Sequence, residues 1–77
     1  MIKVYIKVDN DNNIVDINSS IFLKDTTGYI CIDEGIGDKY AHAQNNYLKT
    51  PLRYDNGQYS HKYINNKIEY IPEENLL

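Results

Sequence analysis

The strongest constraint on the fold is the pattern between Pro51 and Pro72, where apolar and polar residues alternate and two turn signals interrupt them. Asn56-Gly57 is the strongest short-range signal for a β-hairpin, because a type I′ turn requires positive φ at both of its central residues. Asn65-Asn66 is a second and weaker signal of the same kind. The segment therefore predicts a three-stranded antiparallel meander, ended on both sides by prolines that cannot continue a sheet.

Two-residue turns at both signals would gather the aromatic residues of the meander on one face. Tyr54 then pairs with Tyr59 across the first turn, and Tyr63 pairs with Ile68 across the second. The remaining pairs of this register are Leu52 with His61, His61 with Tyr70, and Lys62 with Glu69. One face collects Leu52, Tyr54, Tyr59, His61, Tyr63, Ile68 and Tyr70. The opposite face carries Arg53, Asp55, Gln58, Ser60, Lys62, Lys67 and Glu69.

The N-terminal segment predicts a hairpin of its own. Residues 2–8 alternate between apolar and polar, turn-forming residues fill positions 9–13, and the strand pattern resumes at 14–17. A two-residue turn at Asp11-Asn12 gives a register with one apolar face and one opposite-charge pair. Its pairs are Ile6 with Ile17, Lys7 with Asp16, and Val8 with Val15.

A third strand and a short helix are expected between the two hairpins. Residues 29–32 have the composition of a strand, and residues 33–35 end it. Asp38 then provides an N-cap or a first-turn acid for a helix over about residues 38–46. The apolar side chains that recur at helical spacing on one side of this segment are Ile36, Tyr40, Ala43 and Tyr47.

The predicted fold is therefore α+β and mostly β, with an N-terminal hairpin, a third strand, one short helix and a C-terminal three-stranded meander. A chain of 77 residues has room for one small domain, residues 1–77. Its core is marginal, because chains of this size bury only roughly 60–65% of the surface they expose when unfolded. We expect residues 72–77 to form a frayed tail.

Composition excludes several classes of function. A net charge of −3 and a pI near 5.1 provide no electrostatic footprint for nucleic acid or for an anionic membrane. The longest purely apolar run has three residues, which is too short to span a membrane, and the N-terminus lacks the apolar segment of a secretory signal. Cys31 is the one cysteine, so no intramolecular disulfide can form. We expect it to pack in the third strand as a small inert hydrophobe.

Few residues have a pattern that points to chemistry. Asp38 and His42 are four apart and could share a divalent metal on a helix, although a capping acid beside a solvated histidine is the commoner arrangement. The run Asp9-x-Asp11-x-Asn13 begins like a calcium loop but lacks the glycine and the glutamate that such a loop requires. His61 is expected to be a packed ring rather than a general base. We expect no catalytic residue, no cofactor and no metal.

A series of short motifs between positions 32 and 68 has spacings that are unlike those of a random sequence. They are Asp33-Glu34-Gly35, Gly37-Asp38-Lys39-Tyr40, His42-Ala43-Gln44, Asn46-Tyr47, Pro51-Leu52 and Asn56-Gly57-x-Tyr59. In this stretch the chain resembles small uncharacterised proteins of phages and prophages in low-GC Gram-positive bacteria, which are typically encoded in the tail module. It departs from their pattern at Asn45, where a glycine is usual, and at His61, where an aromatic residue is usual.

This resemblance implies a non-enzymatic phage or prophage tail-module protein, a minor structural, fibre-associated or assembly component that acts by protein–protein contact. Its expected partners are a phage tail or fibre protein or a second copy of the chain, and neither nucleic acid nor a membrane. It would be present in the host cytoplasm during synthesis and then in the virion tail. Contact would be made through an unpaired strand edge, at the first strand or at residues 68–71, or through leftover aromatic surface.

The aromatic face of the meander leaves two further interpretations open. Packing against the helix would make it core, whereas exposure would make it a ligand surface, because tyrosine-rich faces stack on sugars and anchor proteins. The alternative function is accordingly a carbohydrate (cell-wall) binding accessory module. The candidate interaction surface comprises Tyr54, Tyr59, His61, Tyr63 and Tyr70. A small regulator that inhibits a host protein is compatible with the acidic pI, and no particular residue supports it.

Overall fold

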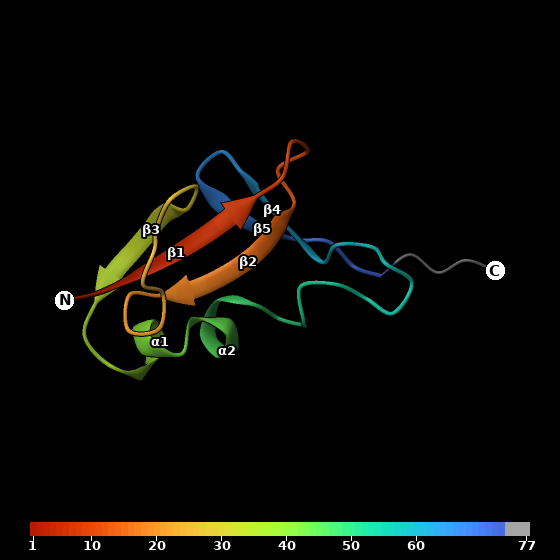
Figure 1. Ribbon diagram of the computed structural model, residues 1–77. Helices are drawn as coiled ribbons and strands as arrows, with labels where there is room; N and C mark the ends of the chain where they lie inside the picture. The colour runs from red at the N-terminus through yellow and green to blue at the C-terminus, as the bar shows by residue number, and fades with distance from the viewer. Residues whose placement is uncertain (74–77) are drawn as a thin grey trace.

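The computed structural model describes residues 1–73, which form five strands in two antiparallel sheets and two short helices. The elements are β1 (Ile2–Val8), β2 (Ile14–Ser19), β3 (Ile30–Gly35), α1 (Asp38–Ala41), α2 (Ala43–Tyr47), β4 (His61–Ile64) and β5 (Lys67–Tyr70) (Figure 1). The predicted mostly-β character is confirmed. Of the predicted frayed tail, residues 74–77 lie outside the described part of the chain.

The first sheet has β1 at its centre, in the order β2-β1-β3. The prediction that the first strand presents an unpaired edge is therefore wrong. The physical reason is that β3 pairs with the side of β1 that β2 leaves free, so that the backbone groups on both sides of β1 are hydrogen-bonded. In the described residues the outer strands of the first sheet are β2 and β3, and the second sheet consists of β4 and β5.

The N-terminal hairpin forms with the predicted pairs Ile6–Ile17 and Lys7–Asp16. Its loop differs from the prediction. The observed loop has three residues, 10–12, between Asp9 and Asn13, whereas the predicted loop has two, Asp11 and Asn12. The N–H of Asp9 donates to the carbonyl of Asn13 at 3.0 Å, and Asn12, the last loop residue, has a φ of 65°. A type I turn followed by one left-handed residue is the usual form of a three-residue hairpin loop.

This loop places Val8 opposite Ile14, so the predicted pairing of Val8 with Val15 is wrong. The register shifts between Lys7 and Val8, which leaves Val15 as the extra residue of a β-bulge. Because of the bulge, Ile14 and Ile17 lie on the same face although they are three residues apart, and both are 0% exposed. An unbroken alternation would have turned one of them to solvent.

The third strand extends further than predicted, from Ile30 to Gly35. A second register shift, between Val4 and Tyr5, brings Cys31 opposite Tyr5. Tyr5 lies on the face of β1 opposite the buried Val4 and Ile6, because successive side chains of a strand alternate. Cys31 is consequently exposed, and the prediction that it packs as a buried hydrophobe is wrong.

The predicted helix is divided in two at His42, whose φ of −108° and ψ of 59° are not helical. As predicted, Tyr40, Ala43 and Tyr47 contact the core. Ile36 does not, since it is 84% exposed. The reason is that the helix begins only after Gly37, whose φ of 112° redirects the chain beyond Ile36.

The C-terminal hairpin of β4 and β5 has the predicted turn and register. Asn65 and Asn66 have φ values of 54° and 64°, as a type I′ turn requires. The pairs are His61–Tyr70, Lys62–Glu69, Tyr63–Ile68 and Ile64–Lys67. The third strand of the predicted meander is reduced to an isolated bridge between Arg53 and Tyr59.

The register of this missing strand also differs by one residue from the prediction. The N–H of Tyr54 donates to the carbonyl of Gln58 at 2.9 Å, so three residues form the loop, and its last residue is Gly57 with a φ of 88°. The predicted pairs Tyr54–Tyr59 and Leu52–His61 are therefore wrong. The cause is the same as in the N-terminal hairpin, because one left-handed residue after a type I turn satisfies the loop.

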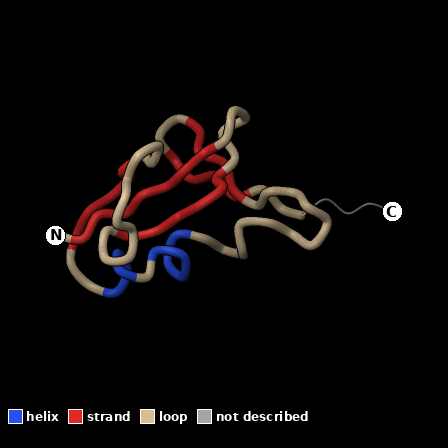
Figure 2. Tube along the Cα trace, viewed as in Figure 1, coloured by secondary structure: helices blue, strands red, loops and turns tan. Residues whose placement is uncertain are grey.

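One core joins the two sheets and the helices. Its buried residues are Val4, Ile6, Ile14, Ile17 and Ala43. The half-buried residues packed against them are Val8, Ile32, Tyr40, Tyr47, Leu48, Leu52, Tyr63 and Ile68. The sheets meet where the N–H of Tyr63 donates to the carbonyl of Asn12 at 2.9 Å, beside a bridge between Asn13 and Lys62. α1 packs against the three strands of the first sheet and α2 against β2, and a long irregular segment connects α2 to β4 (Figure 2).

Candidate functional site

The five residues of the predicted interaction surface do not share an exposed face. His61 is 1% exposed, and Tyr63 is half-buried against the core. Tyr54 and Tyr59 are half-buried, and Tyr70 is 37% exposed. Leu52, Tyr63 and Ile68 of the aromatic face are thus part of the core, whereas the other tyrosines lie at its margin.

Cationic side chains of the chain itself lie over the tyrosine rings at this margin. The guanidinium carbon of Arg53 is 4.8 Å from the ring centroid of Tyr59, and Nζ of Lys49 is 5.3 Å from that of Tyr70. The hydroxyl of Tyr54 donates to the carbonyl of Ile71 at 2.7 Å. A sugar that stacks on Tyr59 or Tyr70 would therefore compete with a cation already placed there.

His61 occupies the centre of a buried hydrogen-bond chain. The backbone N–H of Lys49 donates to its Nε2 at 3.2 Å, so the ring proton resides on Nδ1. Nδ1 lies 2.6 Å from Oγ of Ser60, which itself donates to the carbonyl of Pro51 at 2.6 Å. Burial, and secondarily the charge of Lys49, lowers the pKa of His61, which favours the neutral ring that this chain requires.

The Ser60–His61 pair has the atoms of a nucleophile and a base but not the access that catalysis requires. Ser60 is 0% exposed, and both of its neighbours in the chain of hydrogen bonds belong to the protein. The pair instead fastens residues 49–51 onto β4, in agreement with the prediction of a packed ring at His61. The alternation of the strand predicts Ser60 on the polar face, but it is buried because residues 51 and 52 pack against it: its N–H donates to the carbonyl of Leu52 at 2.9 Å.

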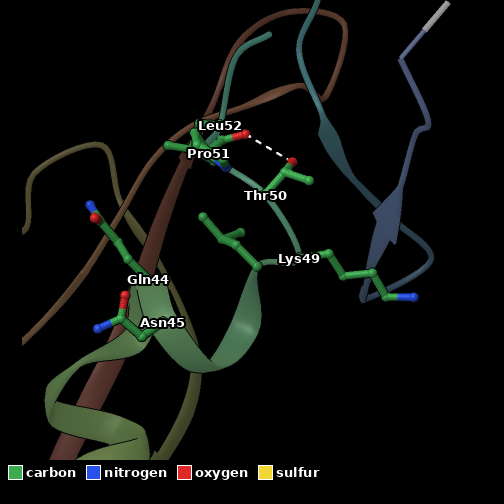
Figure 3. Close-up of a pocket in the computed structure, with 7 residues that line it drawn as sticks. Gln44, Asn45, Lys49, Thr50, Pro51 and Leu52 are labelled. Carbon is green, nitrogen blue, oxygen red and sulfur yellow. Dashed lines mark hydrogen bonds between the residues drawn. The ribbon is translucent and has the colours of Figure 1, made fainter.

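A cleft of about 530 Å³ lies beneath the fastened segment, between this segment and α2 (Figure 3). Its lining residues are Gln44, Asn45, Leu48, Lys49, Thr50, Pro51 and Leu52. The side chain of Lys49 extends away from Gln44 and Asn45 toward β5, where it lies over Tyr70 (Figure 3). Gln44 is also engaged, since its amide donates to the carbonyl of Ile17 at 3.3 Å. The cleft therefore contains amides and apolar surface without a charged group directed at a ligand.

A second hollow, of about 460 Å³, has a different chemistry. This groove lies between β3, the helices and the β4–β5 hairpin. Its half-buried apolar residues, which are continuous with the core, are Ile32, Tyr47, Tyr63 and Ile68. Its exposed polar residues are Lys39, Asn46, Asn66 and Lys67. Tyr63 is the one residue of the predicted surface that lines it.

The electrostatics of the groove are set by a hydrogen bond at one end. The hydroxyl of Tyr47 donates to Oδ2 of Asp33 at 2.6 Å. This bond lowers the pKa of Asp33, while burial and the same bond raise the pKa of Tyr47. Nζ of Lys39 lies 5.3 Å from the ring of Tyr47 and 5.6 Å from that of Tyr40. The end of the groove near α1 thus holds an ionised carboxylate, a neutral phenol and a cation.

The residues considered for metal binding are used in other ways. In residues 1–73 no three histidine, cysteine, aspartate or glutamate side chains come together as metal ligands. The ring of His42 lies 6.0 Å from that of Phe22. Both backbone N–H groups of Asp11 and Asn13 donate to Oδ1 of Asp9 at 2.9 Å, so this carboxylate stabilises the hairpin loop. The hydrogen bond from the side-chain amide of Asn13, and then these two backbone bonds, lower the pKa of Asp9.

Within the described part of the chain, neither helix has the length and apolar character needed to cross a bilayer. Comparisons with protein-family models, with curated protein sequences and with solved structures give no match.

Proposed function

We propose that this chain is a non-enzymatic phage or prophage tail-module protein, a minor structural, fibre-associated or assembly component that acts by protein–protein contact. The sequence motifs between residues 32 and 68 provide the context for this proposal. The burial of Ser60 and His61 supports a non-enzymatic role, because the pair has no access to a substrate.

The observation that carries the proposal is the groove between two strands with open edges. Ile32 of β3 and Ile68 of β5 line it, and each of these strands is the outer strand of its sheet in the described residues. An open edge offers main-chain N–H and carbonyl groups that an extended polypeptide can pair with. An apolar groove beside such an edge provides places for the side chains of that polypeptide.

Protein contact is favoured over carbohydrate binding because cationic side chains of this chain lie over several tyrosine rings. Sugar binding by stacking needs an open ring face, whereas cations of this chain lie over the rings of Tyr47, Tyr59 and Tyr70. The main-chain edges of β3 and β5 have no such cover from another strand of the described residues.

The proposal is tested by mass spectrometry of gradient-purified particles from an induced lysogen that carries the gene. We expect peptides such as residues 54–62 at a fixed ratio to known tail proteins. An assembly component would be absent from particles but would co-purify from the lysate with a tail or fibre protein. Absence from particles, together with no tail or fibre protein bound in the lysate, would contradict the proposal.

A further inference from the structure

We infer that the groove between β3 and β5 binds an extended, acidic segment of the partner polypeptide, which is added as a strand beside β3. This inference rests on the proposed function, because it specifies the partner chemistry for the same surface. Three observations support it: the order of the strands, the apolar residues of the groove and the distribution of charge.

The two sheets meet at the residues that precede β2. Asn13, immediately before β2, forms an isolated bridge with Lys62 of β4, and β5 pairs with β4. β3 and β5 are the strands of the two sheets that this bridge does not involve. Because Ile32 of β3 and Ile68 of β5 line the same groove, a strand seated there would follow the open edge of β3 and also contact β5.

The apolar surface of the groove suits the side chains of an added strand. Tyr63 joins Ile32 and Ile68 to form a half-buried surface that is continuous with the core, and the ring of Tyr47, over which Lys39 lies, borders this surface. Alternate side chains of an extended segment point the same way, so every second residue of the partner would reach this surface. The partner is therefore expected to have apolar residues at alternate positions.

The charge of the groove predicts that the partner residues between these apolar positions are acidic. Lys39 and Lys67 are exposed at the groove in a chain whose net charge is −3, so this patch is positive against the overall charge. The residues that line the groove include these two lysines and no carboxylate, although the charged Asp33, which accepts the hydroxyl of Tyr47, and the exposed Glu34 lie on β3 beside it. An acidic segment would be attracted by the two lysines that line the groove.

The test uses the full chain, labelled with ¹⁵N, and a soluble heptapeptide of alternating valine and glutamate as the probe. We expect its addition to shift the backbone amides of residues 30–35 and 66–68. The same peptide with lysine in place of glutamate is expected to bind at least about fivefold more weakly, because the attraction to two cations becomes repulsion. Equal binding of the two peptides would overturn the assignment of an acidic partner.

Two variants with the same change of charge locate the site. Lys67→Glu is expected to weaken binding of the acidic peptide by about five- to tenfold. Lys24→Glu, in an exposed loop away from the groove, is expected to leave the affinity within about twofold. Matching circular dichroism and melting temperatures verify that both variants are folded. An equal loss in the two variants would overturn the site.

Main-chain pairing is tested with peptides that are N-methylated at alternate positions. In one of the two alternating patterns, methyl groups replace the N–H hydrogens that face β3, and this peptide should not bind. In the other pattern the methylated groups face away from β3, and this peptide should still bind. Equal binding of both peptides would overturn strand addition. Amide shifts at the groove with soluble peptidoglycan fragments, and none with the acidic peptide, would identify a carbohydrate site instead.

The two proposals can fail separately. If the chain is found with tail proteins but the acidic peptide does not bind at the groove, the partner contacts another surface and this inference fails alone. If the peptide binds as expected but the chain neither enters particles nor co-purifies with a tail or fibre protein, the groove chemistry holds and the tail-module function fails.

Discussion

The backbone N–H of Lys49 donates a hydrogen bond to Nε2 of His61 at 3.2 Å, and this bond exists only while the ring is neutral. Through Nδ1 the same ring contacts Ser60, whose hydroxyl reaches the carbonyl of Pro51. One buried side chain thereby fastens the segment after α2 to β4. Protonation of His61 would replace the acceptor at Nε2 with a second donor and break the chain of hydrogen bonds.

The first prediction is that stability falls on mild acidification because of His61. Burial lowers the pKa of His61 in the folded state below its ordinary value of 6.5. Well above pH 6.5 His61 is neutral in both the folded and the unfolded state, so it does not make the stability depend on pH. As the pH falls through 6.5, His61 becomes protonated in the unfolded state but stays neutral in the folded state, and the free energy of unfolding decreases. Stability is therefore lost from pH 6.5 down to the lower pKa of the folded state. Urea unfolding at a series of pH values measures it.

Two variants assign this pH dependence to His61. His61→Phe, which places an aromatic ring at this position, should flatten the profile at mildly acidic pH, although it also lowers stability at neutral pH by removing a hydrogen-bond partner. His42→Gln changes an exposed histidine and should leave the slope unchanged. The carboxyls with lowered pKa values, Asp9, Asp25 and Asp33, affect stability at lower pH, around and below their ordinary pKa of 3.8. A slope that survives in His61→Phe would refute the prediction.

A second prediction concerns the hydroxyl of Ser60. Ser60→Ala leaves Nδ1–H of His61 buried without an acceptor and removes the donor to Pro51, so the free energy of unfolding should fall by about 1–3 kcal/mol. Thr50→Ala is the matched control, because the hydroxyl of the half-buried Thr50 donates to the same carbonyl of Pro51 at 3.1 Å through a hydrogen bond that is exposed to solvent. Its cost should stay within about 0.5 kcal/mol. Urea unfolding at neutral pH compares the two variants, and equal costs would contradict the role assigned to Ser60.

The loop of the C-terminal hairpin is predicted correctly from the sequence, and the other two loops are not. The difference lies in how many loop residues need positive φ. At Asn65-Asn66 both loop residues have positive φ, which is the condition that the asparagine pair predicts. In the other two loops only Asn12 or Gly57 has positive φ. The residue types are the same for both loop classes, so the sequence could not decide between them.

An error of one residue in a loop changes which residues face each other across a hairpin. The three-residue loop that ends at Gly57 places Arg53 rather than Tyr54 opposite Tyr59. The burial of Ser60 has another cause, because residues 51 and 52 pack against a position that alternation alone assigns to the polar face. In the first hairpin the bulge at Val15 corrects the register, and Ile6 still meets Ile17. The groove could not be predicted from the sequence for a different reason. Lys39, Tyr63 and Ile68 belong to different elements, and the distances between these elements depend on the whole fold.

A third prediction concerns the contact between Gly35 and the ring of Tyr40. A Cβ at position 35 would lie 2.3 Å from Cζ of Tyr40, so Gly35→Ala forces the ring to move and should lower the free energy of unfolding by roughly 1–3 kcal/mol. Combining it with Tyr40→Ala should remove this part of the cost, which a double-mutant cycle measures.

Gly37→Ala provides the comparison for this cycle. Nothing lies within 4 Å of a Cβ at position 37, and its cost arises from the φ of 112°. Tyr40→Ala should therefore not relieve it. Additive effects of Gly35→Ala and Tyr40→Ala would contradict the proposed steric contact.

The last prediction concerns the hydrogen bond between Tyr47 and Asp33. This bond lowers the pKa of Asp33, so it stabilises the fold at pH values above 3.8, where the unfolded carboxyl is ionised, and this stabilisation is lost as the pH falls through the lower folded pKa. Tyr47→Phe removes the hydroxyl and keeps the ring against the core. We therefore expect a lower urea midpoint at neutral pH, a higher pKa of Asp33 by NMR titration, and a smaller loss of stability between about pH 5 and pH 3. Tyr5→Phe removes a hydroxyl from the outer face of β1 and should change none of the three. If the pKa of Asp33 is unchanged in Tyr47→Phe, the bond does not hold this carboxylate, and the acidic partner proposed for the groove would then face an Asp33 charge that no neighbour has engaged.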